Sequence, residues 1–380
     1  MNRKKIIIVF VLVSIVIGVA TFFFIKNRGK ESSGSKTTPL IQTEEYITKD
    51  GVKKLTAEKI SDQIVFYPKL IGGKIFFFSS QGMAFYSFDP EKKEAQQISP
   101  PIGTTPNKTW WSPDGTKVIF ALKYDSFLFR QRSSPLLRSG LKDGDQTVWL
   151  FDTNKKAFAM LNKNIESLSW SIDSKKIISL FFNMERGEDT VSTANPDGSS
   201  WKKLIDLITY GGAETGFLPE EKFFYFEEPT ELAGTKLSMG NLVETKAGEF
   251  LVDKNIATDV LDLPEKNMLL YQAFDEKLSY VTTILLDKNS REETNLETIA
   301  SLDRIAIDGS GFLAISVEDE EEDASTKKIT ITNLQSKEKT ILTYPQESAN
   351  KNLSFQNLML ADDGKTLYFS SGSYLYKIAL

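Results

Sequence analysis

Short apolar segments separated by tight polar turns recur from residue 51 to residue 380. In the clearest case the segments Trp110–Trp111 and Val118–Phe120 flank the turn residues Pro113, Asp114 and Gly115. Proline presets its φ angle, aspartate hydrogen-bonds to nearby backbone, and glycine accepts a positive φ, so this order of residues favours a tight turn. We therefore predict a β-hairpin here, with apolar positions on both strands.

The same pattern occurs seven times along the chain. Its turns lie near residues 72, 114, 173, 219, 264, 308 and 363, so successive turns are 42 to 59 residues apart. A second hairpin follows the first in each repeat, as at Val148–Phe158 and Ile329–Leu342. Four short strands at this spacing are typical of a propeller blade. The fold class predicted for residues 51–380 is therefore all-β: a seven-bladed β-propeller with four-stranded blades.

The last repeat is one strand short. After Thr366–Phe369, one further apolar segment, Ser373–Ile378, precedes the last residue, Leu380. A blade of three strands would leave an exposed edge, which closed rings avoid. Upstream of the first repeat, Gly51–Thr56 has the pattern of an outer strand. We predict that this N-terminal strand completes the last blade and closes the ring.

The N-terminal segment differs from the repeats. Ile6–Ile25 is a run of 20 uncharged residues, which as a helix spans roughly 30 Å, the thickness of a bilayer core. It predicts a transmembrane helix at 6–25, after a cytoplasmic tail at 1–5 and before a polar, flexible linker at 26–50. A cleaved signal peptide is the alternative, because Gly18–Ala20 resembles a cleavage site. The run continues to Ile25, and this length favours an uncleaved signal-anchor.

Three basic residues stand on each side of the predicted helix, so charge alone does not orient it. A short tail left in the cytoplasm predicts a single-pass protein of the cell membrane, with the N-terminus cytoplasmic and the propeller extracytoplasmic. The reverse orientation, with a cytosolic propeller, is the alternative that remains open.

Composition excludes several kinds of chemistry. The chain has no cysteine and no histidine, which excludes disulfides, thiolate nucleophiles, imidazole metal ligands and Ser-His-Asp triads. After residue 30 the chain holds 40 basic and 51 acidic residues. That balance argues against a nucleic-acid partner, which would require a basic surface. No cofactor and no metal site is predicted.

Trp111–Lys117, followed by Val118–Phe120, resembles the WD-like repeat of TolB-type propellers, with weaker matches at Trp170–Ile177 and Ala361–Leu367. The resemblance implies a propeller fold and an extracytoplasmic binding module. It does not specify a function, because propellers host many activities. This chain differs from TolB itself in its predicted membrane tether and in lacking a recognisable domain before the ring. Trp110, Trp111 and Trp170 are predicted to be core residues of inner strands.

An insertion at Lys123–Gln146 interrupts the second repeat. It carries basic and aromatic residues that could bind an anionic or carbohydrate partner by charge and stacking. These candidate binding residues are Tyr124, Phe127, Phe129, Arg130, Arg132, Arg138 and Lys142. The alternative is a solvated loop whose phenylalanines pack against the blade.

A second insertion, in the sixth repeat, contains the acidic run Glu318–Asp323. A calcium site is one interpretation, but the run lacks alternating ligand spacing and a turn glycine, so a solvated loop is favoured. In a propeller both insertions would lie on one face. That face is the predicted binding surface for a protein or glycan partner.

No catalytic motif is present, and no pair of carboxylates can be singled out among 51 acidic residues. The predicted function is a membrane-anchored, extracytoplasmic protein- or glycan-binding scaffold of the cell envelope. The alternative is a propeller enzyme, a glycoside hydrolase or lyase with carboxylates in the central channel. Acidic residues facing the channel would favour the enzyme, whereas an apolar or closed channel would exclude it.

Overall fold

The computed structural model describes residues 55–125, 134–136, 141–183, 188–207, 213–227, 235–244, 246–275, 280–311, 313–319, 327–344 and 353–380. All of them belong to one compact unit, Glu45–Leu380. The predicted tail, transmembrane helix and linker lie outside the described residues. Within the described residues, no helix combines the length and the apolar character needed to cross a membrane.

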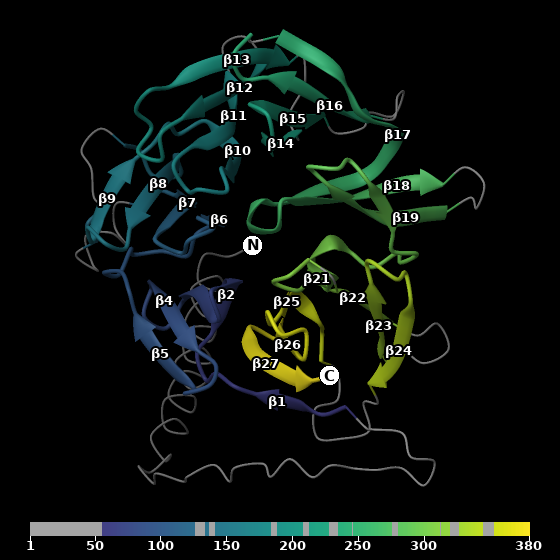
Figure 1. The fold of residues 1–380 in the computed structure, drawn as a ribbon. Helices are drawn as coiled ribbons and strands as arrows, with labels where there is room; N and C mark the ends of the chain where they lie inside the picture. The colour runs from purple at the N-terminus through teal and green to yellow at the C-terminus, as the bar shows by residue number, and fades with distance from the viewer. Residues whose placement is uncertain are drawn as a thin grey trace, which may run out of the picture. The chain divides into compact units, whose positions relative to one another are not determined.

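The chain forms a ring of antiparallel blades around a central axis (Figure 1). Blade 1 consists of β2 (Val65–Ile71), β3 (Lys74–Ser79), β4 (Ala84–Asp89) and β5 (Glu94–Gln97). Blade 2 consists of β6 (Lys108–Trp111), β7 (Lys117–Lys123), β8 (Gln146–Asp152) and β9 (Ala157–Met160). Blade 3 consists of β10 (Ile165–Trp170), β11 (Ile177–Asn183), β12 (Glu188–Ala194) and β13 (Lys202–Leu207). In each blade the first strand lies innermost.

Blades 4 and 5 share one long strand, β17 (Lys246–Leu263). Its first part pairs with β16 as the outer strand of blade 4, and its second part pairs with β18 as the inner strand of blade 5. The other strands of blade 4 are β14 (Ala213–Leu218), β15 (Lys222–Glu227) and β16 (Thr235–Asn241). Those of blade 5 are β18 (Met268–Asp275), β19 (Tyr280–Asp287) and β20 (Glu293–Asn295), with the 3₁₀ helix η1 (Pro264–Lys266) in its first turn.

Blade 6 follows the 3₁₀ helix η2 (Leu302–Arg304) and consists of β21 (Ile305–Ile307), β22 (Leu313–Asp319), β23 (Lys327–Asn333) and β24 (Lys339–Tyr344). Blade 7 consists of β25 (Gln356–Leu360), β26 (Thr366–Ser371), β27 (Tyr374–Ala379) and β1 (Ala57–Lys59). All seven predicted inner hairpins are present, which confirms the seven-bladed propeller.

The turn of the second blade has the predicted chemistry. Asp114 accepts hydrogen bonds from the hydroxyl of Ser112 (2.6 Å) and the backbone N–H of Thr116 (3.0 Å). Gly115 has a φ of 68°, and a Cβ at this position would lie 3.0 Å from the ring of Phe76 in blade 1. Glycine therefore serves both the turn and its close contact with the neighbouring blade.

The N-terminal strand closes the ring, as predicted, but at a different position. It spans Ala57–Lys59 rather than Gly51–Thr56 and pairs with β27, with Ala57 opposite Ile378. Residues 51–54 lie outside the described part. Contacts on both sides of this strand fix its position: Ala57 is buried in the cluster between blades 6 and 7, and Glu58 forms ion pairs with Lys93 and Lys377.

The core consists of clusters between neighbouring blades. Trp111 joins a cluster between blades 1 and 2, and Trp170 joins one between blades 2 and 3. Both side chains are buried, which confirms their predicted core role. Trp110 is half-buried and packs against the second cluster, while its backbone carbonyl accepts a 3.0 Å hydrogen bond from the indole N–H of Trp170.

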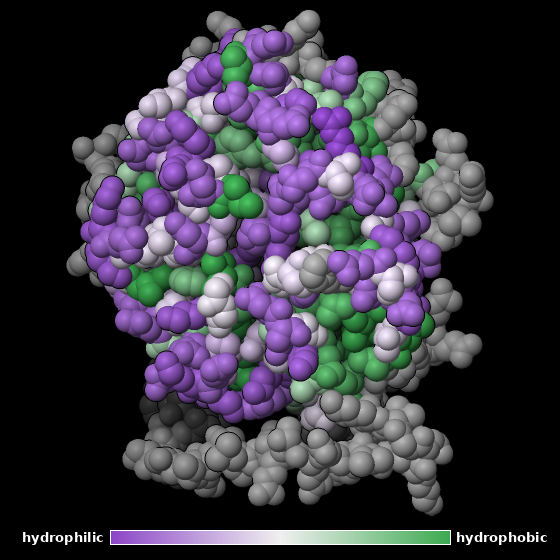
Figure 2. Space-filling model, viewed as in Figure 1, coloured by the Kyte–Doolittle hydropathy of each residue, from purple (hydrophilic) through white to green (hydrophobic). Residues whose placement is uncertain are grey.

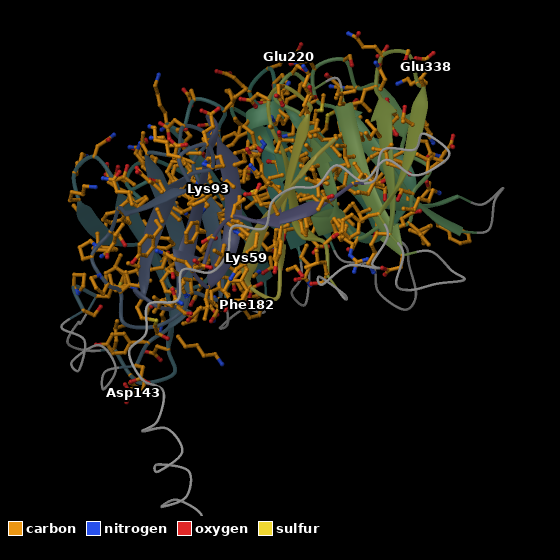
Figure 3. All side chains as sticks on the ribbon, turned by 90° about the horizontal axis from the view of Figure 1, so that it is seen from below. Lys59, Lys93, Asp143, Phe182, Glu220 and Glu338 are labelled. Atoms are coloured by element: carbon orange, nitrogen blue, oxygen red, sulfur yellow. The ribbon has the colours of Figure 1, made fainter. Side chains whose placement is uncertain are left out.

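The ring has two distinct faces (Figure 3). Glu220, in the turn between β14 and β15, and Glu338, between β23 and β24, lie on one face. Phe182, near the end of β11, and Asp143, between β7 and β8, lie on the opposite face. The loops between second and third strands, including both insertions, therefore start from the face opposite the hairpin turns. Figure 2 shows one face, mainly hydrophilic over blades 1 to 4, with more hydrophobic side chains over blades 5 and 6.

Candidate functional site

Only two of the seven candidate binding residues in the blade-2 insertion lie in the described part. Tyr124 is 1% exposed and packs in the cluster between blades 1 and 2. Lys142 is exposed, and its backbone N–H donates a 3.0 Å hydrogen bond to Asp145. Outside the described residues lie Phe127, Phe129, Arg130, Arg132 and Arg138. Binding by this insertion therefore stays a prediction, and the Tyr124 ring contributes to the core.

The acidic run of blade 6 is described only at its first two residues, which end β22. Asp319 forms ion pairs with Arg304 (3.1 Å) and Lys327, and Glu318 accepts hydrogen bonds from the Thr298 hydroxyl and a backbone N–H. Both carboxylates thus have partners in blade 6 or in the segment that precedes it. Among the described residues, no group of three or more acidic side chains is arranged to hold a metal ion.

The central channel contains two adjacent cavities. The aromatic chamber has a volume of about 400 Å³ and is lined mainly by blades 1 to 5. Its principal lining residues are Tyr67, Lys69, Trp110, Ser169, Glu214 and Asp262. The aliphatic chamber has a volume of about 350 Å³ and is lined by blades 1, 5, 6 and 7. Its principal lining residues are Lys69, Leu70, Leu263, Glu265, Ile307 and Leu360.

An ion pair crosses the channel at the boundary of the two chambers. Lys69 of blade 1 lines both cavities and lies 2.7 Å from Glu265, in the first turn of blade 5. Their side chains are 31% and 20% exposed. Burial raises the pKa of Glu265, but the charge and hydrogen bond of Lys69 outweigh it and lower that pKa below its usual value. Glu265 therefore stays ionised at neutral pH, and the ion pair connects blade 1 with blade 5 across the ring.

Two serines of blade 3 hold two carboxylates in the aromatic chamber. Ser167 donates a hydrogen bond to Glu214 of blade 4, and Ser169 donates one to Asp262 of blade 5. Both serines belong to β10 and are separated by one residue, so they share a face with Cα atoms about 7 Å apart. The two carboxylates thus approach the chamber from different blades at neighbouring points.

Asp262 has a second, charged partner. The Lys288 side chain, which is 2% exposed, forms an ion pair with Asp262 and donates a 3.0 Å hydrogen bond to the carbonyl of Phe217. Burial raises the pKa of Asp262, although the charge and hydrogen bond of Lys288 oppose this effect. A Cβ on Gly216 would lie 2.3 Å from Asp262 Oδ2, so only glycine leaves room for this carboxylate to reach across blade 4 to Ser169.

Two aromatic side chains give the chamber apolar surface. Tyr67 is 37% exposed and has a φ of 53° at a β-bulge between Phe66 and Lys69. Positive φ is unusual for a tyrosine, and a bulge redirects side chains. The Tyr67 hydroxyl donates a 2.6 Å hydrogen bond to the carbonyl of Asn107 in blade 2. Trp110 lines the same cavity from the inner strand of blade 2.

The sequence interpretation missed the channel residues. Asp262 carries the one usable signal, because it is a carboxylate between Leu261 and Leu263 in a segment otherwise predicted to be an inner strand. A charged side chain in such a segment indicates either that the strand ends there or that the charge has a specific partner, because charged residues are rarely buried unpaired. Glu214 and Ser167 carry no such signal, since polar residues are common beside strands.

No protein-family model matches the chain, and no curated protein is similar to it in sequence. Its fold is similar to that of oligogalacturonate lyase from Vibrio parahaemolyticus, with a TM-score of 0.62, 11% identity and coverage of 88% of this chain and 96% of that one. It is also similar to the Swd1 β-propeller domain from Myceliophteria thermophila, with a TM-score of 0.54, 8% identity and coverage of 86% of this chain and 100% of that one.

TolB from Acinetobacter baumannii aligns with a TM-score of 0.41, 13% identity and coverage of 82% of this chain and 78% of that one. This TM-score is too low to support an argument. At such identities the comparisons show the β-propeller fold alone.

Proposed function

We propose that this chain is a membrane-tethered, extracytoplasmic propeller of the cell envelope that binds a glycan in the aromatic chamber. The tether rests on the uncharged run Ile6–Ile25. The binding proposal rests on one observation: the partly exposed rings of Tyr67 and Trp110 lie beside the carboxylates of Glu214 and Asp262 in a cavity of about 400 Å³. Sugar rings present apolar C–H faces for stacking and hydroxyl donors for carboxylates, so this combination suits them.

The ionic partners of the channel favour binding over catalysis. Asp262 is paired with Lys288, and Glu265 is paired with Lys69. The lowered pKa of Glu265 disfavours the proton that a general acid must carry at working pH, and both carboxylates can accept hydrogen bonds from ligand hydroxyls.

The propeller enzyme is the second candidate, favoured by the carboxylates in the channel. Glu214 and Asp262 are hydrogen-bonded to serines whose Cα atoms are about 7 Å apart. Two carboxylates that line one cavity are the kind of pair that glycoside hydrolases use. The oligogalacturonate lyase of similar fold is, by its name, an enzyme acting on a glycan. Hydrolysis would release one new reducing end for each bond broken by water.

The test measures saccharide binding by the full-length protein in detergent micelles. The probes are neutral tetrasaccharides of β-1,4-glucose, β-1,4-N-acetylglucosamine and α-1,4-glucose, with α-1,4-galacturonate tetrasaccharide as the anionic probe. We expect one neutral probe to change tryptophan fluorescence through Trp110, and Glu214→Gln to weaken its binding about tenfold or more. Glu94→Gln, on the exposed outer strand of blade 1, is the matched control. If the wild-type protein binds no probe, glycan binding in the chamber is wrong.

The same samples test the enzyme. Reducing ends that appear with the wild-type protein and disappear with Glu214→Gln would establish cleavage of the glycosidic bond instead of simple binding. A protein partner at the blade-2 insertion is a separate proposal. Crosslinking and affinity capture from native membranes, with and without residues 123–146, tests it, because a partner bound there is lost with the insertion.

A further inference from the structure

Lys288 is a buried cation whose side chain bonds to the inner strands of blades 4 and 5. It follows β19, and its backbone N–H donates a 3.1 Å hydrogen bond to the carbonyl of Asn267. Its side chain reaches the inner strands of two blades, Asp262 in blade 5 and the carbonyl of Phe217 in blade 4. The ammonium also lies 5.5 Å from the centroid of the Phe224 ring. These contacts fix the position of the charge.

Asp262 is oriented by donors on both carboxylate oxygens. Lys288 donates to Oδ1 and Ser169 to Oδ2. A carboxylate offers about four lone-pair positions, so acceptor capacity remains after these two bonds. Asp262 lines the aromatic chamber, and its side chain is 11% exposed. The free acceptor capacity is therefore available to a ligand in that chamber.

We propose that Lys288 is a positioning residue that holds Asp262 in place as an anionic acceptor and thereby makes the aromatic chamber selective for neutral, hydroxyl-rich ligands over anionic ones. This inference rests on the proposed function and goes further, because it names the ligand class and the residue pair that selects it. A neutral polyol donates hydroxyl hydrogens to Asp262, whereas a carboxylate on the ligand would face a like charge.

The charge of Asp262 depends on its surroundings. The charged groups near it are Lys288, Glu265, Glu214 and Lys69. Of these, Lys288 favours the ionised form of Asp262 by direct contact, and Glu265 opposes it by charge repulsion. Without Lys288, burial and the charge of Glu265 would both favour the protonated form of Asp262. A protonated carboxyl group accepts fewer hydrogen bonds from ligand hydroxyls.

The experiment follows saccharide affinity from pH 4 to pH 8 with the full-length protein and the probes named above. In the wild-type protein the neutral probe should bind more tightly than galacturonate and lose affinity as Asp262 becomes protonated. The loss of affinity at low pH forms the acid limb of the profile of affinity against pH. With Lys288→Met this acid limb should shift to higher pH by about one pH unit or more, because the cation that lowers the pKa of Asp262 is gone. The preference for the neutral probe should fall at the pH values between the wild-type limb and the shifted limb, where Asp262 loses its charge only in the variant.

Two further variants keep the proposal testable if Lys288→Met does not fold. Lys288→Arg retains the charge and should leave the acid limb in place. Ser169→Ala removes one hydrogen-bond donor to Asp262. It should shift the acid limb to higher pH by less than Lys288→Met does. Lys203→Met, which removes an ion-paired lysine from the exposed outer strand of blade 3, is the matched control and should leave the profile unchanged.

The outcomes distinguish a failure of glycan binding from a failure of the positioning role of Lys288. If the wild-type protein binds no probe at any pH, the proposed function itself fails. If it binds a neutral probe, but Lys288→Met or, failing that, Ser169→Ala leaves both the acid limb and the selectivity unchanged, the positioning role of Lys288 is wrong while glycan binding stands. Tighter binding of galacturonate than of every neutral probe by the wild-type protein would also overturn the selectivity.

Discussion

The closure of the ring by its N-terminal segment can be tested by two substitutions on opposite sides of the closing strand. Leu55 is 6% exposed and packs in the cluster between blades 6 and 7. Ile60 is also 6% exposed but packs in the cluster between blades 7 and 1, and its backbone N–H donates a 2.9 Å hydrogen bond to the carbonyl of Leu375. The two side chains therefore stabilise different blade contacts.

Truncation of either side chain to alanine removes three buried carbon atoms. At about 0.8 kcal/mol for each carbon, plus a cavity contribution, each substitution should lower the free energy of unfolding by about 3 kcal/mol. Because Leu55 and Ile60 belong to separate clusters, the double variant should lose about 6 kcal/mol, the sum of the two. Urea denaturation followed by tryptophan fluorescence measures these differences.

A matched control supports the comparison. Ile172, in the inner turn of blade 3, is 62% exposed, so Ile172→Ala should change the free energy of unfolding by less than about 0.5 kcal/mol. If Ile60→Ala behaves like Ile172→Ala, the segment does not dock between blades 7 and 1, and the reasoning on ring closure is refuted.

Two other predictions concern single side chains. Gly216→Val should destabilise the protein by more than about 2 kcal/mol in urea denaturation and weaken saccharide binding, because its Cβ would lie 2.3 Å from Asp262 Oδ2; unchanged stability would contradict the close approach. Burial raises the pKa of Glu58, but its hydrogen bonds with Lys93 and Lys377 outweigh this and lower it below 4.5. The stabilisation from Glu58 should thus be complete above pH 4.5 and decline as the pH falls through the lowered pKa. Glu58→Gln should abolish that part of the acid dependence, and a parallel loss in both proteins would show that Glu58 does not contribute.

Much of the fold could be predicted because its signals are local. Pro113, Asp114 and Gly115 form their turn within a few residues, and the same backbone hydrogen bonds recur in the inner turns of blades 3, 6 and 7. Counting strands also predicted closure by the N-terminal segment. The position of that strand was wrong by several residues, because its register depends on which side chain, Ala57, fits between blades that lie at the other end of the chain.

The candidate site was much less accessible to prediction. The two carboxylates of the aromatic chamber come from different blades, and the serine that bonds Asp262 is 93 residues away from it in the chain. Gly216 appears in the sequence as an ordinary strand glycine, and its role is visible only where the Asp262 carboxylate passes over it.

The sequence by itself determined the seven hairpins, the four-stranded repeat and the absence of thiol and imidazole chemistry, because these follow from neighbouring residues and from composition. The tertiary structure alone decided which polar residues meet in the channel. Ring closure brings inner strands from distant parts of the chain around one axis, so the pairing of Lys69 with Glu265, and of Lys288 with Asp262, depends on blade geometry rather than on any local pattern.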